Sequence, residues 1–245
     1  GGQPGRSGAV ILSMQSALRA GAGKVSAACH PQVQAIVAAA QPEAMVHGIK
    51  ETDSLEPLLR EASAVALGPG LGQGSWSQEI FSQVMETDVL KVIDADGLNL
   101  LASNPVRSPK LLLTPHPGEA ARLLQMTTDE IASDRFAAAT KLREKYGAQV
   151  LLKGAGSLLV TDRGRCLIDR GSPAMASGGM GDLLTGLIAG LLAQRMAPAQ
   201  ALIAGSLWHA IAGEEAGKDG ERGTLASDLL PHIRQLVNGY GRDDG

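Results

Sequence analysis

The chain has 245 residues, a formal net charge of −3 at pH 7 and 2% aromatic residues among mostly small aliphatic side chains. This length is enough for one substantial core and favours a single α/β domain. The weak acidity, without a Lys/Arg-rich run, argues against a nucleic-acid or membrane-surface partner. No apolar stretch is long enough to span a bilayer, and no secretion signal is recognisable. Cys29 and Cys166 lack disulfide-framework or metal-binding spacing, so we expect reduced thiols in a cytoplasmic protein.

Residues 1–30 predict a glycine-rich loop, then a helix over residues 9–20, then a short strand over residues 24–29. This succession makes most of a βαβ unit whose first strand is missing or lies before Gly1. The chain also starts at Gly1 without an initiator Met. We therefore expect that it was cut from a longer protein.

Apolar patterns of helix and strand alternate along the rest of the chain. Helices are expected over residues 33–40, 55–61, 77–86 and 97–102, from Thr127 to about Tyr146, from Asp182 onward, and over residues 199–216 and 227–237. Strands are expected over residues 64–67, 89–93, 111–113, 150–152, 158–160 and 166–169, whereas residues 44–47 are ambiguous. This alternation is typical of a mainly parallel sheet covered by helices.

Four of the expected strands end in loops rich in glycine, proline or acidic residues, at residues 68–72, 94–99, 114–119 and 153–157. In an open parallel sheet, ligands bind beyond the carboxyl ends of the strands. Loops at that edge can build a single crevice. We therefore expect one ligand-binding crevice there.

Several side chains of these loops have two possible roles. Asp94 and Asp96 could meet a ligand, or Mg²⁺ through water, and the alternative for Asp96 is an N-cap of the helix over residues 97–102. His116 lies between two prolines that stiffen its backbone. Glu119 is either a favourable first-turn acid of a helix or a side chain that reaches into the crevice.

The loop at residues 153–157 contains a lysine and two glycines, which are typical of phosphate binding. Its spacing is not GxxxxGK[ST], and a strand rather than a helix is expected to follow it. It is therefore not a Walker P-loop. Residues 161–164 predict a hairpin turn that leads toward the glycines of the next segment.

Gly178, Gly179 and Gly181 stand before Asp182, where a helix is expected to begin. Glycines and the first turn of a helix offer converging N–H groups to an oxyanion or a phosphate. A carboxylate would repel that anion unless a metal intervenes or the acid takes a proton from a nearby hydroxyl. The alternative is an ordinary tight turn followed by a helix-favouring aspartate.

Five motifs, in this order and spacing, resemble the ADP- or ATP-dependent NAD(P)H-hydrate dehydratases over nearly the full chain. The motifs are GPGLG (68–72), DADGLN (94–99), TPHPGE (114–119), KGAGS (153–157) and GSPAMASGGMGD (171–182). The resemblance extends to the C-terminal domain of bifunctional bacterial members, whose N-terminal half is an NAD(P)HX epimerase. It implies one ribokinase-like α/β domain over residues 1–245, with a central mostly parallel sheet, helices on both faces and its first strand missing. It also implies a homotetramer.

The resemblance further implies ADP or ATP as co-substrate, with Mg²⁺, and no metal-binding residue is assigned. The nucleotide positions fall on Lys153, Gly154, Ala155, Gly156 and Ser157, with Gly178, Gly179 and Gly181, and the positions for NAD(P)H hydrate fall on Ala9, Gly72, His116 and Asp182. In this family the hydroxyl of the hydrated nicotinamide ring is phosphorylated and phosphate is then lost. Asp182 is expected to be the general base, and the amides of residues 178–181 are expected to stabilise the phosphoryl group.

The chain departs from the family pattern at Ser172, Ala174 and Ser177, where Asn, Gly and Thr are usual, and at Gly97, where Ala is usual. A small-alcohol kinase of the same fold, acting on hydroxymethylpyrimidine, hydroxyethylthiazole or a sugar, is one alternative. A catalytically silent nucleotide-binding domain is another. The motif set favours a dehydratase over a kinase, and the acid at position 182 favours an active domain.

Overall fold

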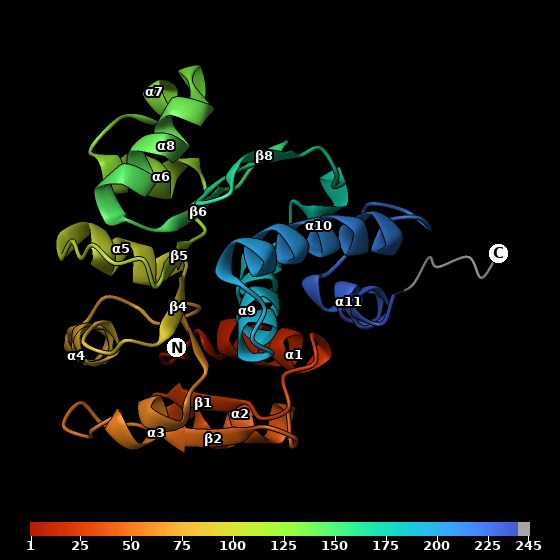
Figure 1. Ribbon diagram of the computed structural model, residues 1–245. Helices are drawn as coiled ribbons and strands as arrows, with labels where there is room; N and C mark the ends of the chain where they lie inside the picture. Colours follow the sequence, from red (N-terminus) through yellow and green to blue (C-terminus); the bar gives the residue numbers. More distant parts are fainter. Residues whose placement is uncertain (240–245) are drawn as a thin grey trace.

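The computed structural model describes residues 1–239 of the chain. Its main sheet has six strands in the spatial order β3-β4-β5-β6-β7-β8 (Figure 1). The strands are β3 (Ala64–Leu67), β4 (Leu90–Ile93), β5 (Leu111–Leu113), β6 (Gln149–Leu152), β7 (Ser157–Thr161) and β8 (Gly164–Ile168). The first four run parallel, and β7 and β8 continue the sheet antiparallel. The predicted mostly parallel sheet is confirmed.

The central strands are mainly apolar because both faces of the sheet are covered, although β4 contains the buried Lys91 and β6 the buried Gln149. Successive side chains of a strand point to opposite faces. Leu111 and Leu113 belong to the core on one face, whereas Leu112 belongs to the core on the other. In the same way, Ile93 belongs to the core that contains Leu111, and Val92 belongs to the core that contains Leu112. The leucine, isoleucine and valine side chains of these strands therefore contribute to two separate hydrophobic layers.

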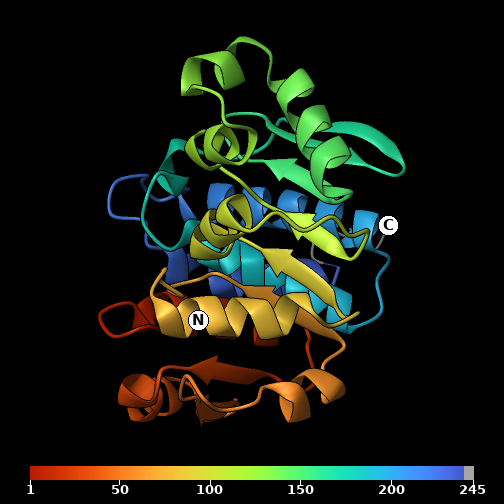
Figure 2. The same cartoon turned by 90° about the vertical axis from the view of Figure 1, so that its left-hand side faces the viewer.

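Helices form one layer on each face of the sheet, as predicted. One layer packs on the core that contains Leu111 and consists of α3 (Glu56–Glu61), α4 (Ser75–Met85), α5 (Ala95–Ser103), α6 (Pro117–Leu124), α7 (Thr128–Ser133) and α8 (Arg135–Tyr146). The other consists of α1 (Ser7–Arg19), α9 (Met180–Ala193), α10 (Pro198–Ala216) and α11 (Leu229–Val237). Figure 2 looks onto the first layer, with the blue helices of the second layer behind the strands. Single 3₁₀ turns occur at Pro31–Val33, Pro173–Met175 and Ala226–Asp228.

A second, two-stranded sheet lies at the bottom of Figure 1. Its parallel strands are β1 (Ser26–Cys29) and β2 (Met45–Gly48), and α2 (Gln34–Ala40) connects them. The ambiguous residues 44–47 thus belong mostly to a strand. A small core of its own, which includes Val33, Val37 and Cys29, joins this unit to α1.

The prediction of a single helix from Thr127 to about Tyr146 is wrong. The helix is interrupted at Asp134, which separates α7 from α8. The backbone there is not helical (φ −148°, ψ 86°), and the Asp134 side chain accepts a hydrogen bond from the Ala137 N–H at 2.8 Å. Aspartate competes for backbone N–H groups in this way and favours helix starts over helix interiors. The predicted capping box of Thr127 and Glu130 is confirmed at the start of α7.

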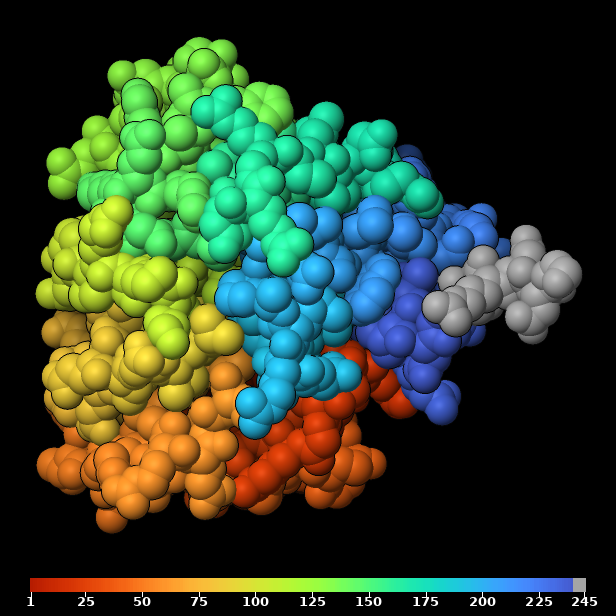
Figure 3. All heavy atoms as spheres, in the orientation of Figure 1, coloured from red at the N-terminus to blue at the C-terminus, as the bar shows by residue number. Residues whose placement is uncertain are grey.

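Helix α9 packs very closely against α1, because Gly186 and Gly190 have no side chains at the contact. A Cβ atom on Gly186 would lie 1.9 Å from the Ser13 carbonyl oxygen, and one on Gly190 would lie 2.8 Å from that of Ala17. Figure 3 shows the start of the chain (red) packed against its last third (blue). Helix α9 also packs on β3 and β4. None of the helices between residues 1 and 239 is long and apolar enough to cross a membrane.

Candidate functional site

An open cleft of about 480 Å³ lies where the loops after the parallel strands meet the first turns of α1 and α9. It is lined by Gly5, Arg6, Gly8, Ala9, Gly70, Ala95, Asp96, Asn99, Glu119 and Asp182. These residues come from segments that are far apart in the sequence. The predicted crevice beyond the carboxyl ends of the strands is therefore present.

A buried ion pair lies beside the cleft. Lys153, the first residue after β6, places its Nζ atom 2.6 Å from Asp94 Oδ1, and Asp94 follows β4. The same Nζ atom is 3.9 Å from Glu119 Oε2. Lys153 is therefore shared by two carboxylates, and its ammonium group is directed toward the cleft residues rather than into solvent.

The first turn of α9 packs directly on this ion pair. The Thr185 hydroxyl lies 3.0 Å from Asp94 Oδ2 and 2.9 Å from the Gly181 carbonyl oxygen, so its one proton serves either acceptor. A Cβ atom on Gly181 would lie 3.2 Å from Asp94 Oδ2 and 3.3 Å from Lys153 Nζ. Gly179 is the N-cap, with φ +90°, and no side chain caps the helix. The absence of a Cβ atom on Gly181 therefore allows this uncapped turn to lie close to the ion pair.

Asp96 is the centre of a second network, so its interpretation as a helix N-cap is wrong. Asp94 holds the N-cap position of α5, and Asp96 lies inside the first turn. Asp96 Oδ2 accepts hydrogen bonds from the Gly72 N–H at 2.8 Å and from Arg6 at 2.7 Å. Asn99 donates more weakly to Asp96 Oδ1. Asp96 thereby ties the GPGLG loop and the N-terminal loop to the wall of the cleft.

The TPHPGE motif forms a capping box at the start of α6. The His116 N–H donates to Glu119 Oε2 at 2.8 Å, and His116 Nδ1 accepts from the Gly118 N–H at 3.0 Å. His116 Nε2 lies 3.5 Å from Glu119 Oε1, and the imidazole is more than half exposed. Glu119 therefore serves both of its predicted roles, since it starts the helix and lines the cleft.

Several titratable groups of the site have shifted pKa values. Burial, reinforced by the Asp94 carboxylate, raises the pKa of Asp182 to about 6, and Lys153 opposes the shift. Burial also raises the pKa of Glu119 to about 7. Burial lowers the pKa of Lys153, but the Asp94, Glu119 and Asp182 carboxylates outweigh this effect and leave the pKa raised. Burial and the nearby Lys153 lower the pKa of His116. At neutral pH the site thus combines a charged lysine with carboxyl groups that can exchange protons.

The GPGLG loop needs glycine at its first position. Gly68 has φ +128°, and a Cβ atom there would lie 1.7 Å from the Asp94 carbonyl oxygen. Only glycine fits a left-handed backbone at such a close approach. The loop therefore interlocks with the DADGLN loop and holds Asp94 and Asp96 in place.

The KGAGS segment is the turn of the β6–β7 hairpin. Gly154 and Gly156 have positive φ angles, and the Ser157 hydroxyl donates to the Gly154 carbonyl at 3.2 Å. Arg135 donates to the Ala155 carbonyl at 2.8 Å. Lys153 approaches Glu119 of the cleft wall, whereas Gly154 and Ala155 are exposed. The strand that follows confirms that the segment is not a Walker P-loop.

The structure places five of the twelve predicted site residues in or against the cleft. Ala9 and Asp182 line the cleft, and Gly72, Lys153 and Gly181 contact its walls. Gly156 and Ser157 lie on the hairpin, and Gly178 is exposed in the loop before α9.

Sequence reasoning missed Arg6 and Thr185. Arg6 has only the signal of a cation at the end of a glycine-rich loop. Thr185 has the signal of a hydroxyl one turn after Gly181 in an otherwise apolar helix. Neither feature of the sequence predicts the contact partner, which is Asp96 for Arg6 and Asp94 for Thr185.

The residues between 1 and 239 contain no group of three or more His, Cys, Asp or Glu side chains that could hold a metal ion. Asp94 and Asp96 are already engaged by lysine, arginine, hydroxyl and N–H donors. A divalent cation at this cleft would therefore need oxygen ligands from a bound molecule.

A protein-family model described as NAD(P)H-hydrate dehydratase matches residues 1–235. A bifunctional NAD(P)H-hydrate repair enzyme from Coxiella burnetii is 46% identical over 240 residues, which are 97% of this chain and 49% of that protein. The chain spans about half the length of the first curated relatives that it matches.

Two solved structures share the whole fold. A ribokinase-like superfamily protein from Enterococcus faecalis has a TM-score of 0.89 and 28% identity, over 98% of this chain and 85% of that one. An ADP/ATP-dependent NAD(P)H-hydrate dehydratase from Bacillus subtilis, co-crystallised with ATP and Mg²⁺ and soaked with CoA, has a TM-score of 0.82 and 27% identity, over 96% and 89% of the two chains. The predicted ribokinase-like fold is confirmed.

Proposed function

This chain belongs to the NAD(P)H-hydrate dehydratase family, and from that premise we propose that it returns NAD(P)H hydrate to NAD(P)H at the expense of ADP or ATP. The ring hydroxyl of the hydrate is phosphorylated, and phosphate then leaves. The observation that carries the proposal is the position of Asp182, on the first turn of α9 and in the wall of the cleft.

Asp182 acts as the general base of the first step. It accepts the proton of the ring hydroxyl while the hydroxyl oxygen bonds to the terminal phosphorus of the nucleotide, whose bridging P–O bond breaks. Its pKa of about 6 supports this role, because an acid with a pKa near the working pH is charged yet still basic. Departure of phosphate with the C–O electron pair and loss of a proton from the adjacent ring carbon then restore the ring double bond.

The nucleotide binds at the β6–β7 hairpin, through residues 153–157, and at the start of α9, through Gly178, Gly179 and Gly181. The uncapped N–H groups of α9 and the ammonium group of Lys153 supply the positive charge that a transferring phosphoryl group needs. The absence of a Cβ atom on Gly181 keeps the path to Lys153 open. The hydrate binds against Ala9, Gly72 and His116 with its hydroxyl toward Asp182.

A bound nucleotide would supply most of the ligands of Mg²⁺, because the described residues contain no group of three or more side chains that could hold the ion. When bound, the ion would neutralise charge on the phosphates. The same proposal includes a homotetramer in the cytoplasm. It also includes an epimerase fused to this domain, which the bifunctional relatives support because the chain covers 49% of one of them.

The deciding experiment incubates the protein with NADH hydrate, Mg²⁺ and either ADP or ATP, and follows the return of NADH absorbance. We expect NADH to form only when a nucleotide is present. Phosphorylation of hydroxymethylpyrimidine, hydroxyethylthiazole or a sugar without NADH formation would instead identify a small-alcohol kinase. Nucleotide binding without turnover of any of these compounds would identify a silent domain.

A further inference from the structure

The cleft of the proposed reaction has an acidic lining, although its substrate carries phosphate groups. Asp96, Glu119 and Asp182 all line it. In NAD(P)H hydrate, a negatively charged diphosphate bridge joins the nicotinamide half to the adenosine half. Among the described residues that line the cleft, Arg6 alone has a cationic side chain. Arg6 is therefore the group in this lining that can attract the bridge.

The backbone of Arg6 is fixed by the loops around it. Its N–H donates to the Gln3 carbonyl at 2.9 Å. Its carbonyl oxygen packs so closely on Gly70 that a Cβ atom there would lie 2.4 Å from this oxygen. Helix α1 begins at the next residue, Ser7. The GPGLG loop and the start of α1 thus hold the Cα atom of Arg6 in one place.

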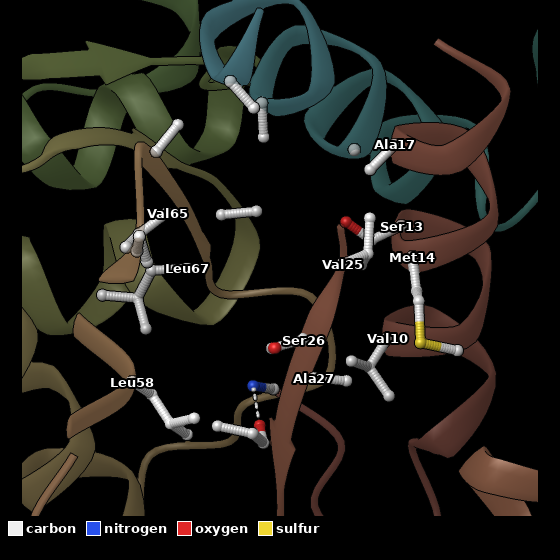
Figure 4. A pocket seen from close by; sticks show the side chains of 18 of the residues that line it. Val10, Ser13, Met14, Ala17, Val25, Ser26, Ala27, Leu58, Val65 and Leu67 are labelled. Carbon is white, nitrogen blue, oxygen red and sulfur yellow. Dashed lines mark hydrogen bonds between the residues drawn. The ribbon is translucent and has the colours of Figure 1, made fainter. Parts of the chain in front are cut away.

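The packing of α1 fixes the direction of its first turn as well. Val10, Met14 and Ala17 line a largely apolar cavity on one side of the helix, which Figure 4 shows. Gly8 and Ala9 line the cleft instead. Because these two sets of residues meet different surroundings, the rotation of the helix about its axis is set. The end of α1 that carries Arg6 consequently faces the cleft.

The guanidinium group of Arg6 is oriented by one carboxylate and keeps other donors free. Its Nη1 atom lies 2.7 Å from Asp96 Oδ2, and its side chain is 55% exposed, against 10% for that of Asp96. The same carboxylate accepts from the Gly72 N–H at 2.8 Å and from the more distant amides of Gln73 and Asn99. Because several donors share the charge of Asp96, it offsets only part of the guanidinium charge. Within residues 1–239, the Nε and Nη2 atoms of Arg6 have no hydrogen-bond partner.

The two cations of the site lie beside different carboxylates. Lys153 is engaged with Asp94, next to the start of α9 where the nucleotide is proposed to bind. Arg6 shares Asp96 Oδ2 with the N–H of Gly72, a position proposed to bind the hydrate. This division assigns Lys153 to the transferring phosphoryl group and leaves Arg6 for the phosphates of the hydrate.

We propose that Arg6 binds the diphosphate bridge of NAD(P)H hydrate, an inference that rests on the function proposed above. A guanidinium group holds phosphate oxygens through paired N–H donors in a fixed plane. Asp96 sets the orientation of that plane, so little ordering remains to be done when the substrate enters. NADH hydrate and NADPH hydrate share this bridge, so the contact serves both.

The test compares Arg6→Gln and Arg6→Lys with the wild-type chain. Arg19→Gln is the matched control, because it removes an exposed arginine from the other end of the same helix. KM and kcat are measured for NADH hydrate, and KM is measured for ADP or ATP. Calorimetry gives the affinity for NADH, which has the same bridge and needs no turnover, and Tm reports on folding.

We expect Arg6→Gln to raise KM for NADH hydrate and to weaken NADH binding by roughly tenfold to a hundredfold, the scale of a lost hydrogen bond to a charged group. The kcat value and the KM for nucleotide should not change, because the lost contact is the same in the ground state and the transition state. Arg6→Lys should recover part of the affinity, since it keeps the charge but not the planar donors. Arg19→Gln should match the wild type in every measurement.

Three results for Arg6→Gln would overturn the inference. Unchanged KM for NADH hydrate and unchanged NADH affinity would show that Arg6 does not meet the bridge. A raised KM for nucleotide alone would place Arg6 on the nucleotide phosphates. A fall in kcat without a change in NADH affinity would make Arg6 a structural tie to Asp96. A wild-type chain that forms no NADH would instead contradict the proposed function, and calorimetry would still decide the role of Arg6.

Discussion

Two carboxyl groups at the cleft, Asp182 and Glu119, lie in surroundings that favour their neutral forms. Burial is the main cause for both, and the Asp94 carboxylate adds to it. Lys153 prevents a larger shift because its ammonium group lies within reach of all three acids. The balance leaves two acids whose pKa values lie near neutral pH, which suits proton transfer.

Replacing the acid of α9 by its amide tests the proposed base. We expect Asp182→Asn to reduce turnover of NADH hydrate by at least ~100-fold, the usual scale for a general base. Nucleotide affinity should change little, because the N–H groups of the helix and Lys153 remain. Turnover is followed by NADH absorbance and affinity by calorimetry.

The control for this variant is Asp219→Asn, which changes an exposed aspartate in the loop after α10 and should leave turnover intact. In the wild-type protein, kcat/KM should fall as the pH drops below about 6, where Asp182 takes up a proton. A large loss of nucleotide affinity in Asp182→Asn would assign the residue to nucleotide binding instead.

The raised pKa of Glu119 predicts how the stability of the protein depends on pH. Its folded-state pKa of about 7 lies above its ordinary value, so the folded state holds a proton that the unfolded state releases, and stability falls as the pH rises through this window. Glu119→Gln keeps the capping acceptor but cannot ionise. We expect this variant to be more stable than wild type at pH 8, on the order of 1–3 kcal/mol, and not at pH 4.

Glu130 provides the matched control, since it occupies the same capping-box position in α7. Hydrogen bonds from Thr127 lower its pKa, so its charged form stabilises the fold. Glu130→Gln should therefore lower Tm at pH 8 rather than raise it. Equal effects of the two substitutions at pH 8 would contradict the burial argument for Glu119.

At the scale of elements, the position of α9 depends on two residues without side chains, Gly186 and Gly190. Its two interior glycines allow the α1 backbone to approach, and this contact sets where Asp182 meets the cleft. Glycine costs about 1 kcal/mol relative to alanine inside a helix. The close crossing must therefore contribute more than the glycines cost.

We expect Gly186→Ala to destabilise the protein despite the better helix propensity of alanine, because the new Cβ would lie 1.9 Å from the Ser13 carbonyl oxygen. A loss of 1–3 kcal/mol is the typical scale for overpacking. Gly8→Ala is the control: it lies in the partner helix with nothing near its Cβ, and should be neutral or slightly stabilising. Thermal unfolding of both variants is the measurement, and a stabilised Gly186→Ala would refute the close crossing.

At the scale of the whole molecule, local pattern predicted most of the elements. The strand at residues 64–67 and the helices over 55–61 and 199–216 agree with the structure to within a residue or so, because buried strands and helices leave strong apolar periodicities. The break at Asp134 was missed because one local hydrogen bond decides it.

The sequence predicted where the site lies in the fold, but it did not predict which side chains of the site contact one another. Strand ends in a parallel sheet must meet at one edge, so a cleft there with Lys153 after β6 follows from order and spacing. Asp182 lies on α9 instead, and the glycines before it and the family resemblance predicted its role. The contact partners do not follow from order and spacing, because the Lys153–Asp94 pair joins residues 59 positions apart, and Thr185–Asp94 joins residues 91 apart. Such contacts depend on packing distances that no local pattern carries.

The crossing of α1 and α9 has a consequence for how the protein is made. Gln194, just after α9, donates to the Ala20 carbonyl at 2.7 Å, and these residues are 174 positions apart. At a synthesis rate of 5–20 residues per second, α1 waits on the order of ten seconds or longer for its partner helix. The N-terminal half therefore leaves the ribosome with an apolar face still uncovered, and the wall of the cleft is among the last parts of the fold to be completed.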